Sequence, residues 1–221
     1  MIEVQFSIQG ERLTLLPDRA AYLKSKKILI LSDLHLGKIN HFRKAGIAVP
    51  SAANKANTEL LIKLMMELNP KRVIFIGDLF HSHYNAEWEV LGQILKHFSN
   101  CSFELVPGNH DIMGAAQYLR HKIKFHDTHF ALSKKIILTH EPVENPNENF
   151  YYLSGHIHPA VTLYGKGRQS LTFPCFWFGR KQGFLPAFGV FTGFKSVRPE
   201  AEDKIFGIVN GKVIAMESSP A

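Results

Sequence analysis

Cysteine is scarce in this sequence, because the 221 residues contain only Cys101 and Cys175. Two cysteines do not build a disulfide framework, so the chain is expected to work in a reducing compartment, and the cytoplasm is the simplest prediction. The lack of thiolate ligands also argues against a structural zinc site. Both cysteines are expected to be small buried apolar side chains.

Long apolar runs are missing as well. The longest, residues 171–178 and 184–194, are too short and too rich in glycine and proline to cross a bilayer. The chain begins Met1-Ile2-Glu3 with no basic region ahead of an apolar run, so no signal peptide is expected. We therefore predict no membrane partner.

Acidic residues are outnumbered, with 19 Asp and Glu against 26 Lys and Arg, which gives a formal net charge of +7 and a pI near 9.4. This excess favours anionic partners such as nucleic acid, nucleotides or phosphorylated metabolites, although many basic proteins bind none of them. The hydrophobic content of 45% is that of an ordinary globular protein. The length suits one domain, and no linker, repeat or low-complexity tract divides it, so we predict a single domain over residues 1–221.

Histidine, in contrast, is plentiful, with 12 residues, and a metal site would explain the number. Five short apolar runs each stop at a small residue that is followed by aspartate, asparagine or histidine. Glycine lets the backbone turn there because it has no Cβ to clash. Buried strands that end in this way would bring oxygen and nitrogen donors together in one site. In chain order, the runs and the residues that follow them are 27–31 with Ser32-Asp33-Leu34-His35, 73–76 with Gly77-Asp78, 103–106 with Gly108-Asn109-His110-Asp111, 136–138 with Thr139-His140, and 151–153 with Ser154-Gly155-His156-Ile157-His158.

The first half of the chain alternates strands and helices, and the second half is mostly strands. Residues 3–16 alternate apolar and polar side chains around Gln9-Gly10, which predicts a hairpin. Helices are expected from an N-cap at Ser51 to Leu68, and near residues 86–98 and 113–121. Further strands are expected at residues 123–125, 129–132, 135–138, 151–153, 160–164, 171–178 and in the run to Phe194, with a last hairpin at Asn210-Gly211. This order predicts α/β layering, with a mostly β layer packed on the sheet of the first half.

The donors at the strand ends suit a pair of metal ions. A mixed set of imidazole and carboxylate ligands favours Mn, Fe, Zn or a similar divalent ion. The set is too large for one tetrahedral ion but suits two ions that share a bridging aspartate. Two such ions, about 3.5–4 Å apart, lower the pKa of bound water and clamp the attacking and leaving oxygens of an in-line displacement. The donors are Asp33, His35, Asp78, Asn109, His140, His156 and His158.

His110 needs a separate role, since it stands beside Asn109 and has Asp111 as a neighbour that could orient it. A histidine next to the metal ions could protonate a leaving alkoxide. General acid catalysis of this kind contributes roughly 10²–10⁴ in rate. We therefore predict His110 and Asp111 as catalytic residues.

In order, spacing and strand context, these five motifs resemble those of the calcineurin-like metallophosphoesterases. The resemblance runs over residues ~28–160. It implies an α/β (α+β) fold, a two-layer β sandwich flanked by helices, with a dinuclear centre. It also implies that Asp33, His35, Asp78 and His158 bind one metal ion, and that Asp78, Asn109, His140 and His156 bind the other, with His110 as proton donor.

The sequence departs from the family pattern at two places. Thr139 stands where the family often has glycine, and His81-Ser82 stands where the protein-serine/threonine phosphatases of the superfamily have Asp-Arg. The second difference argues against that substrate class. Further segments are similar to the DNA-ligase-associated DNA damage response endonuclease group known as PdeM, which implies a role beside a ligase, a helicase and an exonuclease. These segments are Ser32–Lys38, Phe42-Arg43 with Gly46 and Pro50, and residues 185–193.

Other residues near the motifs carry more than one interpretation each. Lys38 and Arg43 could pair with substrate phosphates or belong to a solvated basic loop. His81 could support the metal ions, contact substrate or be structural. The aromatic residues between 173 and 178 are expected in the core rather than on a base-stacking surface. Residues 185–193 are expected to form a buried strand, or their glycines mark a close approach of backbone to the site.

We predict a phosphodiesterase that depends on two divalent metal ions, Mn by preference and Fe, Zn or Mg as alternatives, and that acts as a DNA endonuclease in DNA repair. A metal-bridging hydroxide would attack phosphorus, and His110 would protonate the leaving group. DNA or another phosphodiester is the expected substrate, with a DNA ligase and a helicase as candidate partners. One alternative is a phosphatase or nucleotide hydrolase that acts on small phosphorylated metabolites. Another is a non-catalytic scaffold, or a weakly active docking subunit, of a repair complex.

Overall fold

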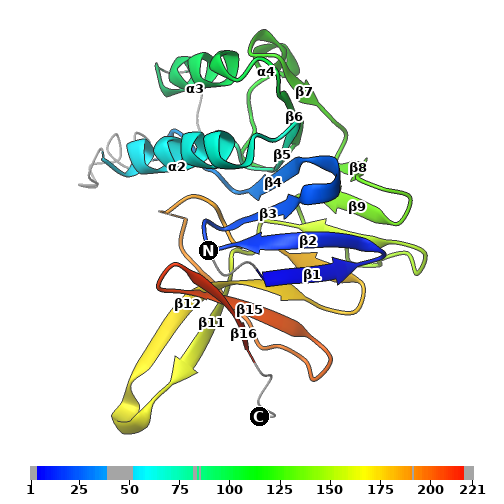
Figure 1. Cartoon of the computed structure of the whole chain (residues 1–221), viewed down its shortest axis with the longest axis vertical. Coiled ribbons are helices and arrows are strands. Elements are labelled where there is room, and N and C mark those ends of the chain that lie inside the picture. Colours follow the sequence, from blue (N-terminus) through cyan, green and yellow to red (C-terminus); the bar gives the residue numbers. More distant parts are fainter. Residues whose placement is uncertain (1–3, 39–51, 82–83, 85, 191, 217–221) are drawn as a thin grey trace.

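The computed structural model describes residues 4–38, 52–81, 84, 86–190 and 192–216. Two β-sheets pack face to face, and the described α-helices lie on the outer side of the first sheet (Figure 1). This confirms the predicted α/β fold, a two-layer sandwich with flanking helices.

The first sheet contains seven strands in the order of the sequence. Its first half is antiparallel, and the neighbours from β4 to β7 are parallel. The central strand β4 is buried along its whole length because helices cover one face of the sheet and the second sheet covers the other. The strands are β1 (Val4–Ile8), β2 (Glu11–Leu16), β3 (Ala20–Leu23), β4 (Ile28–Ser32), β5 (Arg72–Ile76), β6 (Ser102–Val106) and β7 (Ile123–Phe125).

Three described α-helices connect the parallel strands and cover the outer face of this sheet. They are α2 (Ala52–Leu68), α3 (Ala86–His97) and α4 (Ala115–Arg120). Each places apolar residues on the sheet, for example Leu64 from α2, Trp88 from α3 and Tyr118 from α4. The predicted helices are thus confirmed within a few residues, while the predicted N-cap Ser51 lies outside the described residues.

The second sheet comes from the second half of the chain, as the sequence predicted. Its strands lie in the order β14-β11-β12-β13-β10-β9-β8, and β15 and β16 extend it from β12. Strand β10 is parallel to both β9 and β13. The strands are β8 (His129–Ala131), β9 (Ile136–Thr139), β10 (Tyr151–Ser154), β11 (Pro159–Tyr164), β12 (Ser170–Phe178), β13 (Gln182–Phe184), β14 (Lys195–Ser196), β15 (Lys204–Val209) and β16 (Lys212–Met216).

A second apolar core fills the space between the sheets. Ile74 and Ile76 of β5 meet residues of the second sheet that include Phe176 and Phe178. Phe176 and Phe178 are 0% and 2% exposed, so these aromatic residues belong to the core, as expected. Both cysteines are free, and burial raises the pKa of the Cys175 thiol to about 12. Cys101 is only partly buried.

Turn chemistry places both predicted hairpins correctly. Gln9 and Gly10 have φ of 49° and 82°, and Asn210 and Gly211 have φ of 48° and 70°. Two successive residues with positive φ are what a type I′ turn requires. Among the described helices, none has the length and apolar character that crossing a membrane requires.

Two local predictions were wrong. Strand β3 (Ala20–Leu23) was not foreseen, because the left-handed turn that precedes it uses Arg19, at φ 60°, rather than glycine. Residues 185–190 were expected as a buried strand, but β13 ends at Phe184 and an irregular buried segment follows. Its backbone bonds to the end of β4 instead, from Phe188 N to Ser32 O at 2.8 Å.

Candidate metal centre

The predicted donors gather where five strands end. Asp33 and His35 follow β4, and Asp78 follows β5. Asn109 comes after β6, His140 follows β9, and His156 and His158 follow β10. Parallel strands end at the same edge of a sheet, so the two sheets together direct these side chains to one place. The structure therefore brings the predicted donor residues together.

The backbone at these positions is unusual. The left-handed region is sparsely populated by residues other than glycine, and a residue held there costs about 1–3 kcal/mol. Such a conformation persists only where the surroundings fix it, as the hydrogen bond from His35 N to Asp78 O at 2.8 Å does here. Five of the donor residues have positive φ, namely Asp33 (54°), His35 (47°), Asp78 (49°), His156 (65°) and His158 (47°).

The motif glycines leave the room that the donors occupy. A Cβ on Gly77 would lie 1.9 Å from His140 Nδ1, and one on Gly108 would lie 2.3 Å from Asp78 Oδ1. A Cβ on Gly155 would lie 2.4 Å from Asp33 Oδ2. Each glycine is thus required by a donor from a different motif, which explains why the motifs share this residue.

One group of donors consists of Asp33, His35 and His158. His158 Nδ1 lies 3.2 Å from the carbonyl oxygen of Thr192. A carbonyl only accepts, so in the neutral ring Nδ1 carries the proton and Nε2 keeps a lone pair. That Nε2 faces Asp33 Oδ1 at 3.2 Å, although both atoms are acceptors.

Two buried atoms of this group have no hydrogen-bond partner among the described residues, Asp33 Oδ1 and His35 Nε2. His35 Nε2 lies 3.5 Å from Asp78 Oδ2. Burial, followed by the repulsion of Lys38, lowers the pKa of His35 far below its usual range, so the ring is neutral. Two buried atoms without a hydrogen-bond partner, close to a second carboxyl group, are where a bound cation would be stabilised.

A second group contains Asp33, Asp78 and His140. His140 Nδ1 faces the carbonyl oxygen of Ile76 at 3.3 Å, which again leaves Nε2 as the acceptor. Around this Nε2 lie three further donor atoms: Asn109 Oδ1 at 3.1 Å, His156 Nδ1 at 3.1 Å and Asp78 Oδ1 at 3.5 Å.

Asp78 lies between the two groups. Its Oδ2 faces His35, and its Oδ1 faces His140, each at 3.5 Å. This is the arrangement that a carboxylate shared by two ions needs. The donor set, rich in nitrogen and carboxylate oxygen and without sulfur, fits two divalent ions. Asp33 belongs to both groups by distance, whereas the family resemblance assigned it to one ion.

His110 stands beside this centre rather than in it. Its backbone N–H donates to Asp78 Oδ1 at 2.9 Å. Its ring lies against His81, with centroids 3.8 Å apart, and is 5.7 Å from the ring of His35. The side chain is half-buried, so part of the ring is accessible to solvent.

Asp111 holds the loops and does not contact the His110 ring. Its Oδ2 accepts from Gly108 N at 2.8 Å, and its Oδ1 accepts from Leu79 N at 3.0 Å and from the Tyr118 hydroxyl at 3.3 Å. Burial raises the pKa of Asp111 to about 6. The expectation that Asp111 orients His110 is therefore replaced by a positioning role, because its hydrogen bonds tie the loop after β6 to the loop after β5.

The three residues expected near substrate fall at different places. His81 Nδ1 lies 3.1 Å from His35 Nδ1, so His81 supports a donor residue from behind. Lys38 is half-buried near Asp33 and Asp78, and burial lowers its pKa even though both carboxylates raise it. Arg43 lies outside the described residues.

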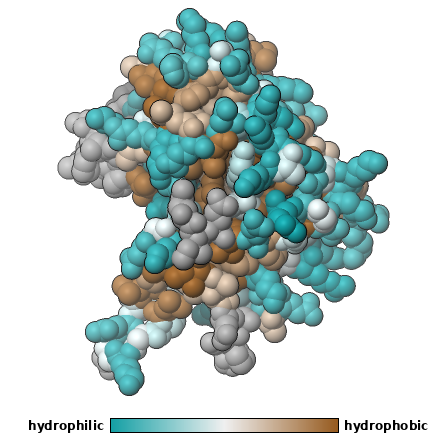
Figure 2. Space-filling view, viewed as in Figure 1, coloured by the Kyte–Doolittle hydropathy of each residue, from teal (hydrophilic) through white to brown (hydrophobic). Residues whose placement is uncertain are grey.

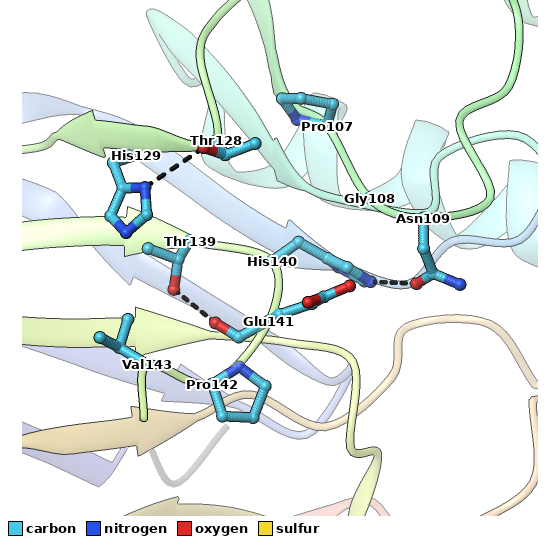
Figure 3. Close-up of a pocket in the computed structure, with 10 residues that line it drawn as sticks. All are labelled: Pro107, Gly108, Asn109, Thr128, His129, Thr139, His140, Glu141, Pro142 and Val143. Carbon is cyan, nitrogen blue, oxygen red and sulfur yellow. Dashed lines mark hydrogen bonds between the residues drawn. The ribbon is translucent and has the colours of Figure 1, made fainter. Parts of the chain in front are cut away.

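A cavity of about 440 Å³ adjoins the centre beside Asn109 and His140 (Figure 3). Pro107, Thr128 and Val143 contribute to its walls, and His129 and Glu141 line it as well. Asn109 and His156 are the exposed members of the donor set, so the centre opens on this side. The cavity is large enough for a nucleoside or a small ester.

Sequence reasoning missed contacts that brace the centre from α2 and from residues 185–190. Buried Asn57 of α2 donates to Leu34 O at 3.3 Å and accepts from Val190 N at 3.1 Å. A Cβ on Gly189 would lie 2.8 Å from Leu34 O, so backbone approaches backbone closely here. The glycines of the segment were the one signal, and their alternative interpretation as a close approach agrees with this contact.

The model of the calcineurin-like phosphoesterase family matches residues 26–211 of the chain. The chain belongs to this family, and it is a hydrolase that acts on phosphoester bonds. Divalent metal ions are implied by the family and fit the donors described above. None of the curated proteins matches the chain.

Among solved structures, the nuclease MPE of Pseudomonas putida is similar over nearly the whole molecule. The two chains are 26% identical, with a TM-score of 0.79, and the match covers 97% of this chain and 100% of the nuclease. The protein of unknown function AQ665 from Aquifex aeolicus is 18% identical over 63% of this chain and 81% of its own, with a TM-score of 0.43. TT1561 of Thermus thermophilus is 12% identical over 87% of this chain and 98% of its own, with a TM-score of 0.37.

Proposed function

We propose that the protein is a phosphodiesterase that cleaves DNA internally, with Asp33, His35, Asp78, Asn109, His140, His156 and His158 as ligands of two divalent ions. The observation that carries the proposal is the approach of a buried imidazole nitrogen to each oxygen of Asp78, from His35 on one side and His140 on the other. The likeness to a nuclease over the whole chain supports a nucleic-acid substrate. Imidazole and oxygen ligands without thiolate fit Mn²⁺, Fe²⁺ or Zn²⁺, and Mn²⁺ is the ion we propose.

Bound divalent ions supply Lewis acidity, which stabilises charge on phosphoryl oxygens and lowers the pKa of water. The chain's own residues orient the reaction. Asp33 and Asp78 are 0% and 2% exposed, so the surrounding packing holds their carboxyl groups in place. His158 and His140 are held in one tautomer by backbone carbonyls, which points Nε2 of each ring into the site.

His110 is the proposed proton donor to the leaving oxygen. Its backbone is anchored to Asp78, and its ring packs at a tilt against His81, which together hold the side chain beside the centre. A proton delivered to the leaving alkoxide is worth roughly 10²–10⁴ in rate.

The first experiment compares hydrolysis of a diester and a monoester reporter, bis(p-nitrophenyl) phosphate and p-nitrophenyl phosphate, in Mn²⁺. We expect the wild type to prefer the diester, and His110→Ala to lose about 10²–10⁴ in kcat while binding the same amount of Mn²⁺. His97→Ala is the matched control, since His97 is an exposed histidine at the end of α3 whose ring lies against Phe98 rather than a donor residue. Wild-type rates in a metal-replete His110→Ala enzyme would contradict its role as proton donor.

Cleavage of circular single-stranded DNA then tests the endonuclease itself, because only internal cleavage opens a circle. A diesterase that hydrolyses linear strands and leaves circles intact would be an exonuclease. A location in the cytoplasm and an association with a DNA ligase and a helicase of a repair complex stay predictions. Co-purification with those enzymes tests the association.

A second candidate is a phosphoesterase of small phosphorylated metabolites. The cavity of about 440 Å³ beside Asn109 and His140 favours it, since such a volume suits a small ligand. A preference for the monoester reporter, together with hydrolysis of nucleotides and no cleavage of DNA, would select this candidate over the nuclease.

A further inference from the structure

Strands β11 and β12 form an arm that projects from the second sheet (Figure 1). Strand β11 pairs with β14 only at Pro159 and Ala160, and β12 pairs with β15 only from Cys175 onward. Among the described residues, the outer parts of the two strands therefore pair only with each other. A free two-stranded ribbon is marginally stable by itself, so one that projects into solvent calls for an explanation.

The two faces of the arm differ in character. Leu163 and Leu171 lie opposite each other on one face and are 44% and 65% exposed. The other face carries hydroxyl groups, with Thr162 Oγ1 2.9 Å from Thr172 Oγ1 and 3.2 Å from Ser196 Oγ. Tyr164 ends this row on the same face as Thr162 and is 84% exposed.

The charge of this part of the chain is one-sided. Residues 149–199 contain none of the 19 acidic residues of the protein, but six of its lysines and arginines. Lys166 lies at the tip of the arm, and Lys195 lies on the strand beside its base, both exposed. In the space-filling view the end of the arm is hydrophilic (Figure 2). The arm itself, residues 159–178, contains two basic residues and no acidic one, and such a segment suits a polyanion.

The arm also starts at the candidate metal centre. Pro159, its first residue, follows His158 directly. At about 3.3 Å per residue, Tyr164 lies roughly 20 Å further along the strand. A nucleic-acid strand advances about 3.4 Å per stacked nucleotide, so the arm runs beside about six nucleotides.

We propose that the β11–β12 arm binds the nucleic-acid strand on one side of the scissile phosphate. Tyr164 offers a ring on which a base stacks, the hydroxyls of Thr162 and Thr172 face the sugar-phosphate backbone of the nucleic acid, and Lys166 attracts phosphates. This rests on the proposed nuclease function and deepens it, because it makes a chain of several nucleotides the preferred substrate over a small diester.

Binding is measured with the Mn²⁺-loaded full chain and a fluorescein-labelled, phosphorothioate-protected single strand of about 12 nucleotides, twice the reach of the arm. Tyr164→Ala is expected to raise the Kd about 5- to 100-fold, the loss of one stacked base. Lys166→Ala is expected to weaken binding and to reduce the dependence of log Kd on log salt by about one. Lys124→Ala, an exposed lysine of β7 on the other sheet, is the matched control and should bind as the wild type does.

The small diester reporter provides the second measurement, because it is too short to reach Tyr164 from the centre. Both arm variants are expected to hydrolyse it at the wild-type rate. Wild-type affinity for DNA in Tyr164→Ala and Lys166→Ala would overturn the inference. If the wild type instead binds DNA through the arm but does not cleave it, the proposed nuclease function fails and the arm's role stands.

The exposed face with Leu163 and Leu171 could instead contact a second copy of the chain. Light scattering of Leu171→Ser tests this. A shift from dimer to monomer in Leu171→Ser, with DNA affinity unchanged in Tyr164→Ala and Lys166→Ala, would make the arm a protein contact and overturn its proposed role. A wild type that is monomeric at every concentration leaves the arm free for DNA and supports it.

Discussion

The ligand edge, where the strands of the two sheets deliver their donors, and the β11–β12 arm are joined by one peptide bond, yet they are built in opposite ways. At the edge, Asp33 and Asp78 are almost fully buried, and their positive φ angles are enforced by neighbouring strands. On the arm, Tyr164 and Leu171 are mostly exposed, and the backbone has standard strand pairing. Metal ligands and catalytic groups must be held at fixed positions, whereas binding a long substrate requires only a surface of sufficient length and suitable charge. Substitutions should therefore be severe at the edge and selective on the arm.

The largest expected effect comes from Asp78→Asn. The change removes the charge between the two donor groups, so we expect kcat for the diester reporter to fall by on the order of 10²–10³ or more. It also removes repulsion from Asp33, so the metal-free variant should unfold at a temperature equal to or above that of the metal-free wild type. Bound Mn²⁺, measured by elemental analysis, should fall below that of the wild type. Full metal content with a normal rate would show that Asp78 is not shared by two ions.

The second largest effect is expected where the His140 ring packs against Gly77. Gly77→Ala places a Cβ 1.9 Å from His140 Nδ1 at a position with φ of 69°. Gly211→Ala is a matched control, because its φ is 70° but nothing lies within 4 Å of the added Cβ. Both variants bear the cost of the left-handed backbone, about 1–2 kcal/mol, and only Gly77→Ala adds overpacking of about 1–3 kcal/mol. Denaturant unfolding should show this difference, and equal losses in the two variants would mean that His140 moves away freely.

The strand ends could be predicted from sequence because each motif carries a local physical signal. A buried apolar run that stops at Gly77 or Gly108 before a polar side chain needs no knowledge of its partners. The irregular path of residues 185–190 could not be predicted from a local signal of this kind. Gly189 is required because the backbone of Leu34 passes close to it, and such a contact between distant parts of the chain leaves no periodic pattern. The same holds for Asn57, which bridges two loops from inside a helix.

The role of Asp111 shows the same limit. Its place next to His110 in the sequence suggested an orienting partner, but the structure turns the two side chains to different neighbours. The arm is a further case, since its strands at residues 160–164 and 171–178 were expected. Their projection beyond the sheet depends on where β14 and β15 stop pairing, which the strand pattern does not reveal.

Asp111→Asn tests the positioning role of Asp111, and its expected effect is smaller than those of the two preceding variants. The amide of asparagine keeps one oxygen that accepts a hydrogen bond, but its NH₂ group faces a backbone N–H that the second carboxylate oxygen had accepted from. Two donors then face each other, which should destabilise the fold by about 1–3 kcal/mol. Because Asp111 acts through the loops, Mn²⁺ affinity should drop about 10–100-fold. The pH profile of kcat at saturating Mn²⁺ should keep its shape. A displaced profile would instead restore a direct link between Asp111 and His110.

The smallest effect concerns a polar cluster within the first sheet but away from the ligand edge. Glu104 accepts from Arg72 Nε at 2.6 Å and lies 2.7 Å from His126 Nε2. Burial alone would raise the pKa of Glu104, but hydrogen bonds from Arg72 and His126 outweigh it and lower the pKa. A lowered pKa means that the carboxylate stabilises the fold above its unfolded pKa, and that this contribution is lost as pH falls through the folded value. Glu104→Gln should therefore cost on the order of 1 kcal/mol at neutral pH and nothing in acid, where the protonated wild type has lost the same interaction. Thermal unfolding from pH 7 down to about 3 measures the difference, and a cost that persists in acid would assign it to packing rather than to charge.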